Sequence, residues 1–431
     1  MQTSLDLIAN KAKQKKQHRF RHLYTMLNQE NLEDSFKLLN KRSATGVDRV
    51  SVKQYGKHLR TNVVKLVDRL KRKCYRAKLV KREWIPKSNG KLRPLGMPIT
   101  EDKLLQKTAS RILEAIFDGD FLNSSYGYRI GKSPLDAVRK LKSKLQFGSF
   151  GYVVEVDIKG FFDHINHDLL LTLLKQRIND NSYLGLISKW LKAGVLEKDG
   201  KVIHPDTGTP QGGVISPVLA NIYLHYAIDL WFQKVVWKQI KGRAYHIRYA
   251  DDFVCLFQYW EDARRFYKAL PKRLSQFGLT IAPDKTRILK FNRFQQTESD
   301  RFSFLGFEFR WGKNQSGGDQ VLAHTCRKKL NSTLKDLALW CKNNRHLGTR
   351  KIMKTFNSKL RGHYNYYGII GNALRLSTFY HRAKCVLKRW LNKRSQKRSY
   401  DWRGFEKMLK AYKVVTPRIT QKRLLNKQLC F

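Results

Sequence analysis

Two adjacent carboxylates, Asp251 and Asp252, interrupt an apolar stretch that reads HIRYADDFVCLF over residues 246–257. The residues on either side have the composition of buried β-strands, so the stretch predicts a β-hairpin with both acids at its turn. Burying a charge without a partner costs on the order of several kcal/mol, and neighbouring like charges also repel each other. A solvated turn would avoid this cost, but the apolar flanks favour a turn that binds a cation.

A third acid, Asp157, ends another apolar stretch, VVEVD at 153–157, which reads as a strand that leads into a helix. If both strands belong to one sheet, the three carboxylates converge at one edge of it. Carboxylates that share divalent cations with substrate phosphates are how enzymes carry out in-line phosphoryl transfer on nucleotides. The three acids therefore indicate a nucleotidyl-transfer site.

The charge of the chain points to a polyanionic partner. Lys and Arg number 86 among 431 residues against 34 acidic residues, which gives a formal net charge of +52 and favours nucleic acid. The sequence has no apolar run of about 18 residues and no signal-peptide core near Met1, so we expect no membrane partner and an intracellular location. Its six cysteines include no CxxC pair, so no zinc site is expected.

The spacing of apolar and turn residues predicts the remaining elements. We expect helices over about 30–70 with an interrupting turn at SATGVDRVS (43–51), and over 101–117, 134–145, 217–232 and 260–277. We also expect paired strands within 81–98 and within 278–291, one strand over 302–311, a boundary loop at 312–320 and a helical region beyond it. Residues 11–21 and the tail from Lys393 are strongly basic. Each is either a solvated face or a nucleic-acid surface, and the aromatic residues interleaved in the tail favour nucleic acid.

Several segments resemble a known family. VVEVDIKGFFDHINHD at 153–168, GTPQGGVISPVLANIYL at 208–224 and YADD at 249–252 resemble the palm of a reverse transcriptase. Together with IPKSNGKLRPLGMP, SSYGYR, GLTIAPDKTRIL and FLGFEF, they resemble the reverse transcriptases encoded by group II introns, over a span from about Thr45 to Phe309. A match of four residues would be weak evidence, whereas seven blocks in the family's order are specific.

The resemblance implies an α+β fold in the form of a right-hand polymerase, with fingers and an antiparallel palm sheet followed by an α-helical thumb. KLRGHYNYYGI at 359–369 resembles the family's thumb, which is also called the maturase or X domain. The implied organisation is a basic N-terminal extension at 1–30, fingers and palm at 31–312, the thumb at 320–392, and a basic tail at 393–431 that is a candidate DNA-binding remnant.

The resemblance also implies roles for individual residues. The implied set consists of catalytic Asp157, Asp251 and Asp252, metal-binding Asp157, Ile158 and Asp251, and nucleotide-binding Lys87, Arg93, Ile158, Phe162, Gln211 and Lys285. The ions are two Mg²⁺, with Mn²⁺ as an alternative. Phe162 would exclude a 2′-hydroxyl, although an ordinary core phenylalanine is the alternative. Lys285 would protonate the leaving pyrophosphate, although a solvated loop lysine is the alternative.

The function that the resemblance implies is RNA-directed DNA synthesis by a protein encoded in a group II intron. Such a protein binds the intron RNA or another structured RNA template, assists splicing, and copies the intron into DNA with a DNA primer or target and deoxynucleotides as further partners. One alternative is a host-adopted enzyme of the same chemistry in DNA repair or antiphage defence. The other is an RNA-binding splicing cofactor with an inert polymerase, which the intact acids disfavour.

The resemblance also bears on location and on DNA cleavage. If the source is prokaryotic, the implied location is the bacterial cytoplasm, with nucleoid association during mobility. Many proteins of the family carry a nuclease with paired cysteines, and this sequence has no such signature. We therefore expect the protein to leave the second strand of a DNA duplex uncut.

Overall fold

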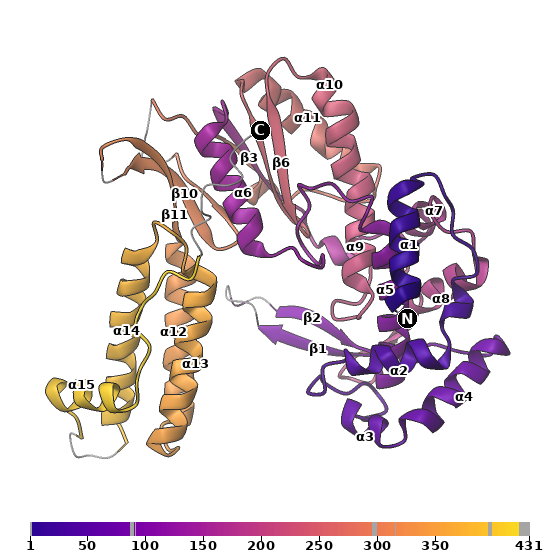
Figure 1. Cartoon of the computed structure of the whole chain (residues 1–431), viewed down its shortest axis with the longest axis horizontal. Helices are drawn as coiled ribbons and strands as arrows, with labels where there is room; N and C mark the ends of the chain where they lie inside the picture. Colours follow the sequence, from indigo (N-terminus) through magenta and orange to yellow (C-terminus); the bar gives the residue numbers. More distant parts are fainter. Residues whose placement is uncertain are drawn as a thin grey trace. The chain divides into compact units, whose positions relative to one another are not determined.

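The computed structural model describes residues 2–86, 90, 92–294, 300–314, 316–394 and 399–421. Figure 1 shows the whole chain, which divides into two compact units by its internal contacts. The first unit comprises Met1–Ala137 and Ser149–Lys290, and the second comprises Val138–Gly148 and Phe291–Phe431. Each unit combines an antiparallel sheet with helices, so the expected mixture of helices and antiparallel sheets is confirmed.

The first unit is built around a four-stranded sheet, which we call the central sheet. Its strand order is β6-β7-β3-β8, and every neighbouring pair is antiparallel. The strands are β3 (Tyr152–Asp157), β6 (Ala244–Tyr249), β7 (Asp252–Phe257) and β8 (Arg287–Lys290). The predicted acidic hairpin is confirmed as β6–β7. Of the strand, turn and strand expected within 278–291, the turn is the 3₁₀ segment η5 (Pro283–Lys285) and the second strand is β8, whereas the first strand is reduced to a single antiparallel β-bridge between Ile281 and Ile158.

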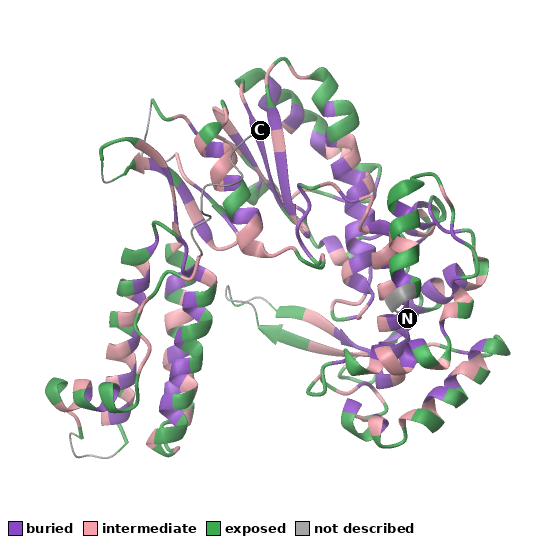
Figure 2. Cartoon of the chain, in the orientation of Figure 1, coloured by how far each residue is buried: buried purple, intermediate pink, exposed green. Residues whose placement is uncertain are grey.

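The central sheet is covered on both faces. Residues 253–257 of β7 are all buried, although a half-exposed strand would bury only every second residue. α11 (Trp260–Ser275) packs against the sheet, and the sheet shares one hydrophobic core with α5 (Thr100–Phe117). Figure 2 shows β3 and β6 largely buried, whereas β8 at the edge has no buried residue. The sheet is therefore a packed base for the loops at its ends.

A long helix follows the Gly- and Pro-rich loop. α9 (Ser216–Leu224) begins with Pro217 in its first turn, as predicted. It continues through two π-helical segments, η3 (His225–Asp229) and η4 (Phe232–Val236), to α10 (Trp237–Gln239). π-helical turns are rare and are frequent at functional sites. Asp229, the last residue of η3, is fully buried.

The second sheet of the first unit has the order β2-β1-β4-β5. β1 and β2 form the antiparallel pair predicted within 81–98, whereas β1 and β4 are parallel. Its strands are β1 (Val80–Pro86), β2 (Leu92–Met97), β4 (Val195–Leu196) and β5 (Val202–Ile203). The other helices before Lys290 are α1 (Gln2–Gln14), η1 (Tyr24–Met26), α2 (Gln29–Lys37), α3 (Val52–Lys57), α4 (Leu59–Lys71), α6 (Pro134–Phe147), η2 (Phe161–Asp163), α7 (His167–Lys175) and α8 (Asn181–Leu191).

The second unit contains a three-stranded sheet of order β11-β10-β9. Its strands are β9 (Phe302–Phe304), β10 (Phe307–Lys313) and β11 (Asp319–Thr325). The single strand expected over 302–311 is wrong, because Leu305 and Gly306 have φ values of 50° and 79° and reverse the chain between β9 and β10. The stretch 312–320, taken from its composition as a boundary, includes the connection from β10 to β11 within this unit.

Besides most of α6, the described part of the second unit contains four helices after β11, and these confirm the helical region expected beyond 320. They are α12 (Arg327–Asn344), α13 (Thr349–Tyr367), α14 (Ala373–Asn392) and α15 (Trp402–Ala411). The apolar positions that predicted them, such as Leu330, Leu337, Ile352 and Phe356, are buried. Within the described ranges, no helix is both long enough and apolar enough to cross a membrane.

Candidate active site

The acidic turn, by which we mean Ala250 and Asp251, joins β6 to β7. Tyr249 pairs with Asp252 across the hairpin, so these two residues alone form the turn. Asp157, at the end of β3, pairs with Asp252 on the other side of β7. The structure therefore brings the three predicted acids to one end of the central sheet, two on neighbouring strands and one in the turn.

The backbone of the turn is held in an unusual conformation. Ala250 has a φ of 56°, in the left-handed region, which costs a non-glycine residue on the order of 1 kcal/mol or more. Such conformations persist only where the surroundings enforce them. Gly127 lies against the turn so closely that a Cβ added to it would be 2.3 Å from the Ala250 nitrogen. Position 127 therefore accepts only glycine, and the Gly127 backbone supports the acidic turn at Ala250.

The electrostatic surroundings of Asp251 favour a bound cation. Burial raises the pKa of this carboxyl and the nearby charge of Asp157 raises it further, while Arg93 and Arg248 lower it. The pKa of Tyr128 is also raised, first by burial and then by Asp251. A carboxylate that is difficult to ionise beside a second carboxylate gains most from a hard cation between them. The residues present therefore fit a divalent ion bound at Asp157 and Asp251.

Asp157 has a cationic partner within the chain. The Lys285 ammonium, at the end of η5, donates a hydrogen bond to Asp157 Oδ2 at 2.8 Å. Both side chains are substantially exposed, so the pair adds little stability and can be exchanged for another cation. Among the described residues, no group of three or more His, Cys, Asp or Glu side chains is arranged to hold a metal ion. Any further ligands would come from the backbone, water or substrate.

Phe162 and Gln211 line one cavity of about 420 Å³, which we call the Phe162 pocket. Trp84 of β1 also lines it. Two backbone hydrogen bonds fix the loop before α9: the Thr209 N–H donates to the Phe162 carbonyl at 2.8 Å, and the Gly96 N–H donates to the Gln211 carbonyl at 2.6 Å. A cavity of this size is large enough for part of a nucleotide. The structure thus brings two of the predicted nucleotide contacts together.

The other predicted nucleotide contacts are dispersed. Arg93 is exposed on β2, and its charge acts on Asp251. The side chain of Ile158 is buried and apolar, so only its backbone could contact a metal ion or a nucleotide. Lys87 lies outside the described residues. The roles of these residues stay predictions.

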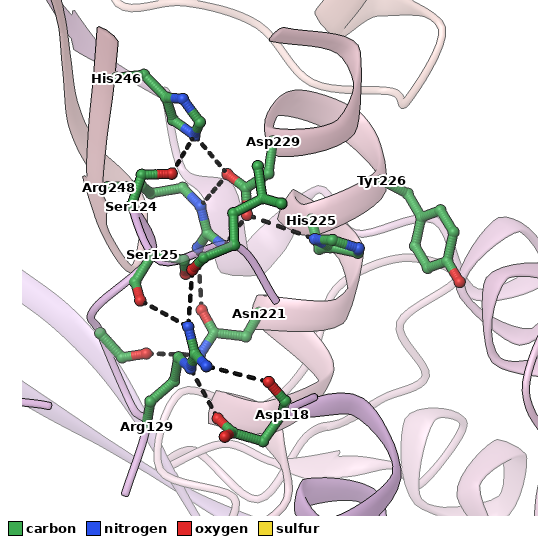
Figure 3. Close-up of polar contacts among 12 residues, drawn as sticks. Asp118, Ser124, Ser125, Arg129, Asn221, His225, Tyr226, Asp229, His246 and Arg248 are labelled. Carbon is green, nitrogen blue, oxygen red and sulfur yellow. Dashed lines mark hydrogen bonds and ion pairs between the residues drawn. The ribbon is translucent and has the colours of Figure 1, made fainter. Parts of the chain in front are cut away.

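Sequence reasoning missed a set of buried polar residues behind the acidic turn, which we call the arginine network (Figure 3). It consists of Arg248, Asp229, Asn221 and Ser125, which are joined by hydrogen bonds of 2.6–2.9 Å. An arginine within the apolar stretch HIRYADDFVCLF was the available signal, because a charge in a buried strand requires a partner. Its partner could not be identified, since Asp229 lies on a different element 19 residues earlier.

Comparisons with known proteins agree with this geometry. The family of reverse transcriptases (RNA-dependent DNA polymerases) matches residues 85–309, which include all three acids. The protein YkfC of Escherichia coli K12 is 31% identical over 320 residues, covering 66% of this chain and 80% of that protein. The group II intron-encoded protein LtrA of Lactococcus lactis is 43% identical over 164 residues, 38% of this chain and 27% of LtrA. The nuclear intron maturase 1 of Arabidopsis thaliana is 30% identical over 108 residues, 24% of this chain and 15% of the maturase.

The central sheet has three acids at one end, and these acids lie within the segment that matches the reverse transcriptase family. The two observations define the class of the protein: it is an RNA-directed DNA polymerase. More particularly, the chain belongs to the group II intron-encoded reverse transcriptase and maturase family. The resemblance inferred from the seven sequence blocks is confirmed.

Proposed function

We propose that the chain is a right-hand polymerase that copies RNA into DNA at the acidic turn. In this proposal the first unit provides the palm, with the central sheet, and the fingers, with β1 and β2, and the second unit provides the thumb. The observation that carries the proposal is the convergence of Asp157, Asp251 and Asp252 at one end of a buried sheet. Two like-charged carboxylates close together at the end of a buried sheet repel each other, which is a costly arrangement without a cation to bind.

Asp157, Asp251 and the backbone of Ile158 would hold two Mg²⁺ ions, with Mn²⁺ as the alternative. When bound, such ions lower the pKa of the primer 3′-hydroxyl and stabilise the pyrophosphate leaving group. Asp252 supports the pair as a neighbouring acid on β7. Lys285 is held near the site by its exposed pair with Asp157, and it would donate a proton to the leaving group.

The Phe162 pocket would select the incoming nucleotide. The half-buried Phe162 ring would lie against the sugar and leave no space for a 2′-hydroxyl, which favours deoxynucleotides. Gln211, from the loop fixed to β2, would contact the nucleotide and its template base. Arg93 and Lys87 would bind the triphosphate, and the influence of Arg93 on the pKa of Asp251 supports its nearness to the reaction.

We further propose that the chain binds group II intron RNA and assists its splicing. The net charge of +52 supports a large RNA-binding surface, since phosphate contacts position a structured RNA without reading its sequence. Similarity to a lactococcal intron-encoded protein and to a plant intron maturase supports the choice of intron RNA.

The variant Asp251→Asn tests whether polymerisation and RNA binding are separable. It keeps the size of the side chain and removes its charge, so we expect primer extension on an RNA template to be lost. Binding and splicing of the intron RNA should persist, because the basic surface is unchanged. Asp34→Asn is the matched control, since Asp34 pairs with Lys37 on the surface and should affect neither activity. Loss of RNA binding in a folded Asp251→Asn protein would contradict separable functions.

A further inference from the structure

Arg248 lies in β6, two residues before Ala250, and its side chain is fully buried at 0% exposure. A guanidinium has five N–H donors, and each one here finds an acceptor, among them Asp229 and Asn221 as Figure 3 shows. Nε and Nη2 donate to the two carboxylate oxygens of Asp229 at 2.8 and 2.6 Å. Nη2 also donates to Ser125 Oγ at 2.8 Å. Nη1 donates to Asn221 Oδ1 at 2.9 Å and to the Ala250 carbonyl at 3.1 Å.

Asp229 is the counter-ion in this network. It is also 0% exposed and ends the π-helical segment η3. Burial would raise the pKa of its carboxyl, but the charge and hydrogen bonds of Arg248 hold that pKa well below its usual range. His246 Nε2 and His225 Nδ1 face the same carboxylate at 3.4 and 3.7 Å. A buried ion pair of this kind adds little stability compared with apolar side chains of the same volume. Its position beside the acidic turn indicates another role.

The network connects the acidic turn to a neighbouring loop. The Tyr126 N–H donates to the Arg248 carbonyl at 2.8 Å, and Asn221 Nδ2 donates to the Gly127 carbonyl at 2.6 Å. The Gly127 backbone in turn lies directly against Ala250. Arg248 therefore holds the Ala250 carbonyl, and Gly127, whose own carbonyl is held by Asn221, lies against the Ala250 nitrogen. This residue has the left-handed conformation, so the turn depends on such support.

We propose that Arg248, with Asp229 as its counter-ion, is a positioning residue that holds the acidic turn so that the Asp251 carboxylate points into the active site. Arg248 does not touch substrate, and it acts through the Ala250 carbonyl on the residue that follows. The inference rests on the proposed function of Asp251. Displacement of a catalytic group by about 1 Å can cost on the order of 100-fold in rate, so the effect of losing this support is measurable.

The first test is Arg248→Met, which removes the donors and keeps the length of the side chain. We expect kcat for single-nucleotide incorporation to fall by about 10- to 100-fold. The dissociation constant for primer–template should change by less than about threefold, because the nucleic-acid surface is unaffected. Unchanged kcat in the folded variant would overturn the proposal.

Arg177→Met is the matched control. Arg177 is another buried arginine of the first unit, with 3% of its side chain exposed, and it pairs with Asp120 at 3.1 Å. It donates to the Ala12 and Lys15 carbonyls at 3.0 and 3.1 Å. We expect its replacement to lower the melting temperature and leave kcat within about twofold. Equal losses of kcat in both variants would mean that the effect of Arg248 on kcat arises from lowered stability, and this result would overturn the proposal.

The double variant Arg248→Met with Asp229→Asn separates positioning from stability. Replacing only Arg248 leaves an uncompensated buried carboxylate, which can prevent folding, whereas the double variant removes both charges. We expect its melting temperature to recover and its kcat to stay low, because the hydrogen bond to the Ala250 carbonyl is still missing. Recovery of kcat together with stability would overturn the proposal.

A comparison with Asp251→Asn distinguishes this proposal from the proposed function. If Asp251→Asn abolishes incorporation while the double variant keeps full kcat, Arg248 is not a positioning residue and the acidic turn is still the catalytic site. If Asp251→Asn keeps full activity, the proposed function itself fails. Reduced kcat in the double variant together with loss of activity in Asp251→Asn supports both.

Discussion

In the proposed function, the ring of Phe162 in the Phe162 pocket selects the sugar of the incoming nucleotide. Replacing it with Ala should open space for a 2′-hydroxyl and lower the discrimination between deoxynucleotides and ribonucleotides by about 10-fold or more. The measurement is the ratio of kcat/KM for one dNTP and the matching NTP on an RNA template. Retained discrimination in a stable Phe162→Ala protein would remove the ring from the site.

The neighbouring ring provides the control for this prediction. Phe161 is buried and contacts the Phe162 ring edge-on at 5.2 Å between centroids. Phe161→Leu should cost on the order of 1 kcal/mol of stability while leaving sugar discrimination unchanged, because this side chain belongs to the core. A fall in discrimination in Phe161→Leu as large as in Phe162→Ala would mean that the effect arises from loosened packing.

At the scale of residues, the sequence reveals charges in apolar surroundings but not their partners. Asp157, Asp251 and Asp252 could be predicted to meet, because each lies at the end of an apolar stretch and like charges there need a common cation. The pairing of Lys285 with Asp157 joins residues 128 positions apart, and no local pattern predicts it. The arginine network was not predicted for the same reason, since its members come from separate elements.

We expect the negative charge of Asp251 to destabilise the β6–β7 hairpin, because burial and the charge of Asp157 raise the pKa of this carboxyl. In the absence of divalent cations, Asp251→Asn should therefore raise the melting temperature at neutral pH. The pKa of Asp251 is higher in the folded protein than its ordinary value, so ionisation of this carboxyl disfavours the folded state. This destabilisation is absent below the ordinary pKa and develops as the pH rises through the folded-state pKa.

The measurement is thermal unfolding of both proteins in EDTA from about pH 4 to pH 8, a range that starts near the ordinary pKa of aspartate. We expect the variant to be more stable at the upper end, with the difference shrinking toward the lower end. A difference that is independent of pH would mean that ionisation of Asp251 is not its cause.

At the scale of elements, the sequence predicts strands and helices where their period is regular. The β6–β7 and β1–β2 hairpins and the helices α5, α6 and α11 follow from period and turn residues. The reversal between β9 and β10 was missed, because Leu305 adopts a left-handed conformation that is rare for leucine. The π-helical widening after α9 was also missed, since the apolar run there shows no break.

At the scale of the whole molecule, the net charge of +52 should make RNA binding strongly dependent on salt. If binding neutralises six or more phosphates, affinity for structured RNA should fall by about 10³-fold or more between about 50 and 200 mM salt. Filter binding across this range gives the slope of log affinity against log salt concentration. A flat response would mean that the charge is not used for RNA.

A triple variant locates part of this surface. Lys351, Lys354 and Arg361 are exposed on α13, so replacing all three with Gln should reduce the slope by up to about 3 without changing the melting temperature. An unchanged slope would place the RNA contacts on other elements.

At this scale the sequence predicted the family from the order of its blocks. The division at Phe291 could not be predicted, because it depends on contacts between distant segments.

We propose that the carboxylates at the end of the central sheet carry out RNA-templated DNA synthesis. The most direct measurement is the rate of single-nucleotide incorporation on an RNA template, at saturating primer–template and dNTP, for Asp157→Asn, Asp251→Asn and the surface control Asp34→Asn. We expect the first two to lose at least about 100-fold in rate with primer–template affinity preserved, and the control to match the unaltered protein. A folded Asp157→Asn or Asp251→Asn protein that incorporates nucleotides at close to the original rate would contradict the account.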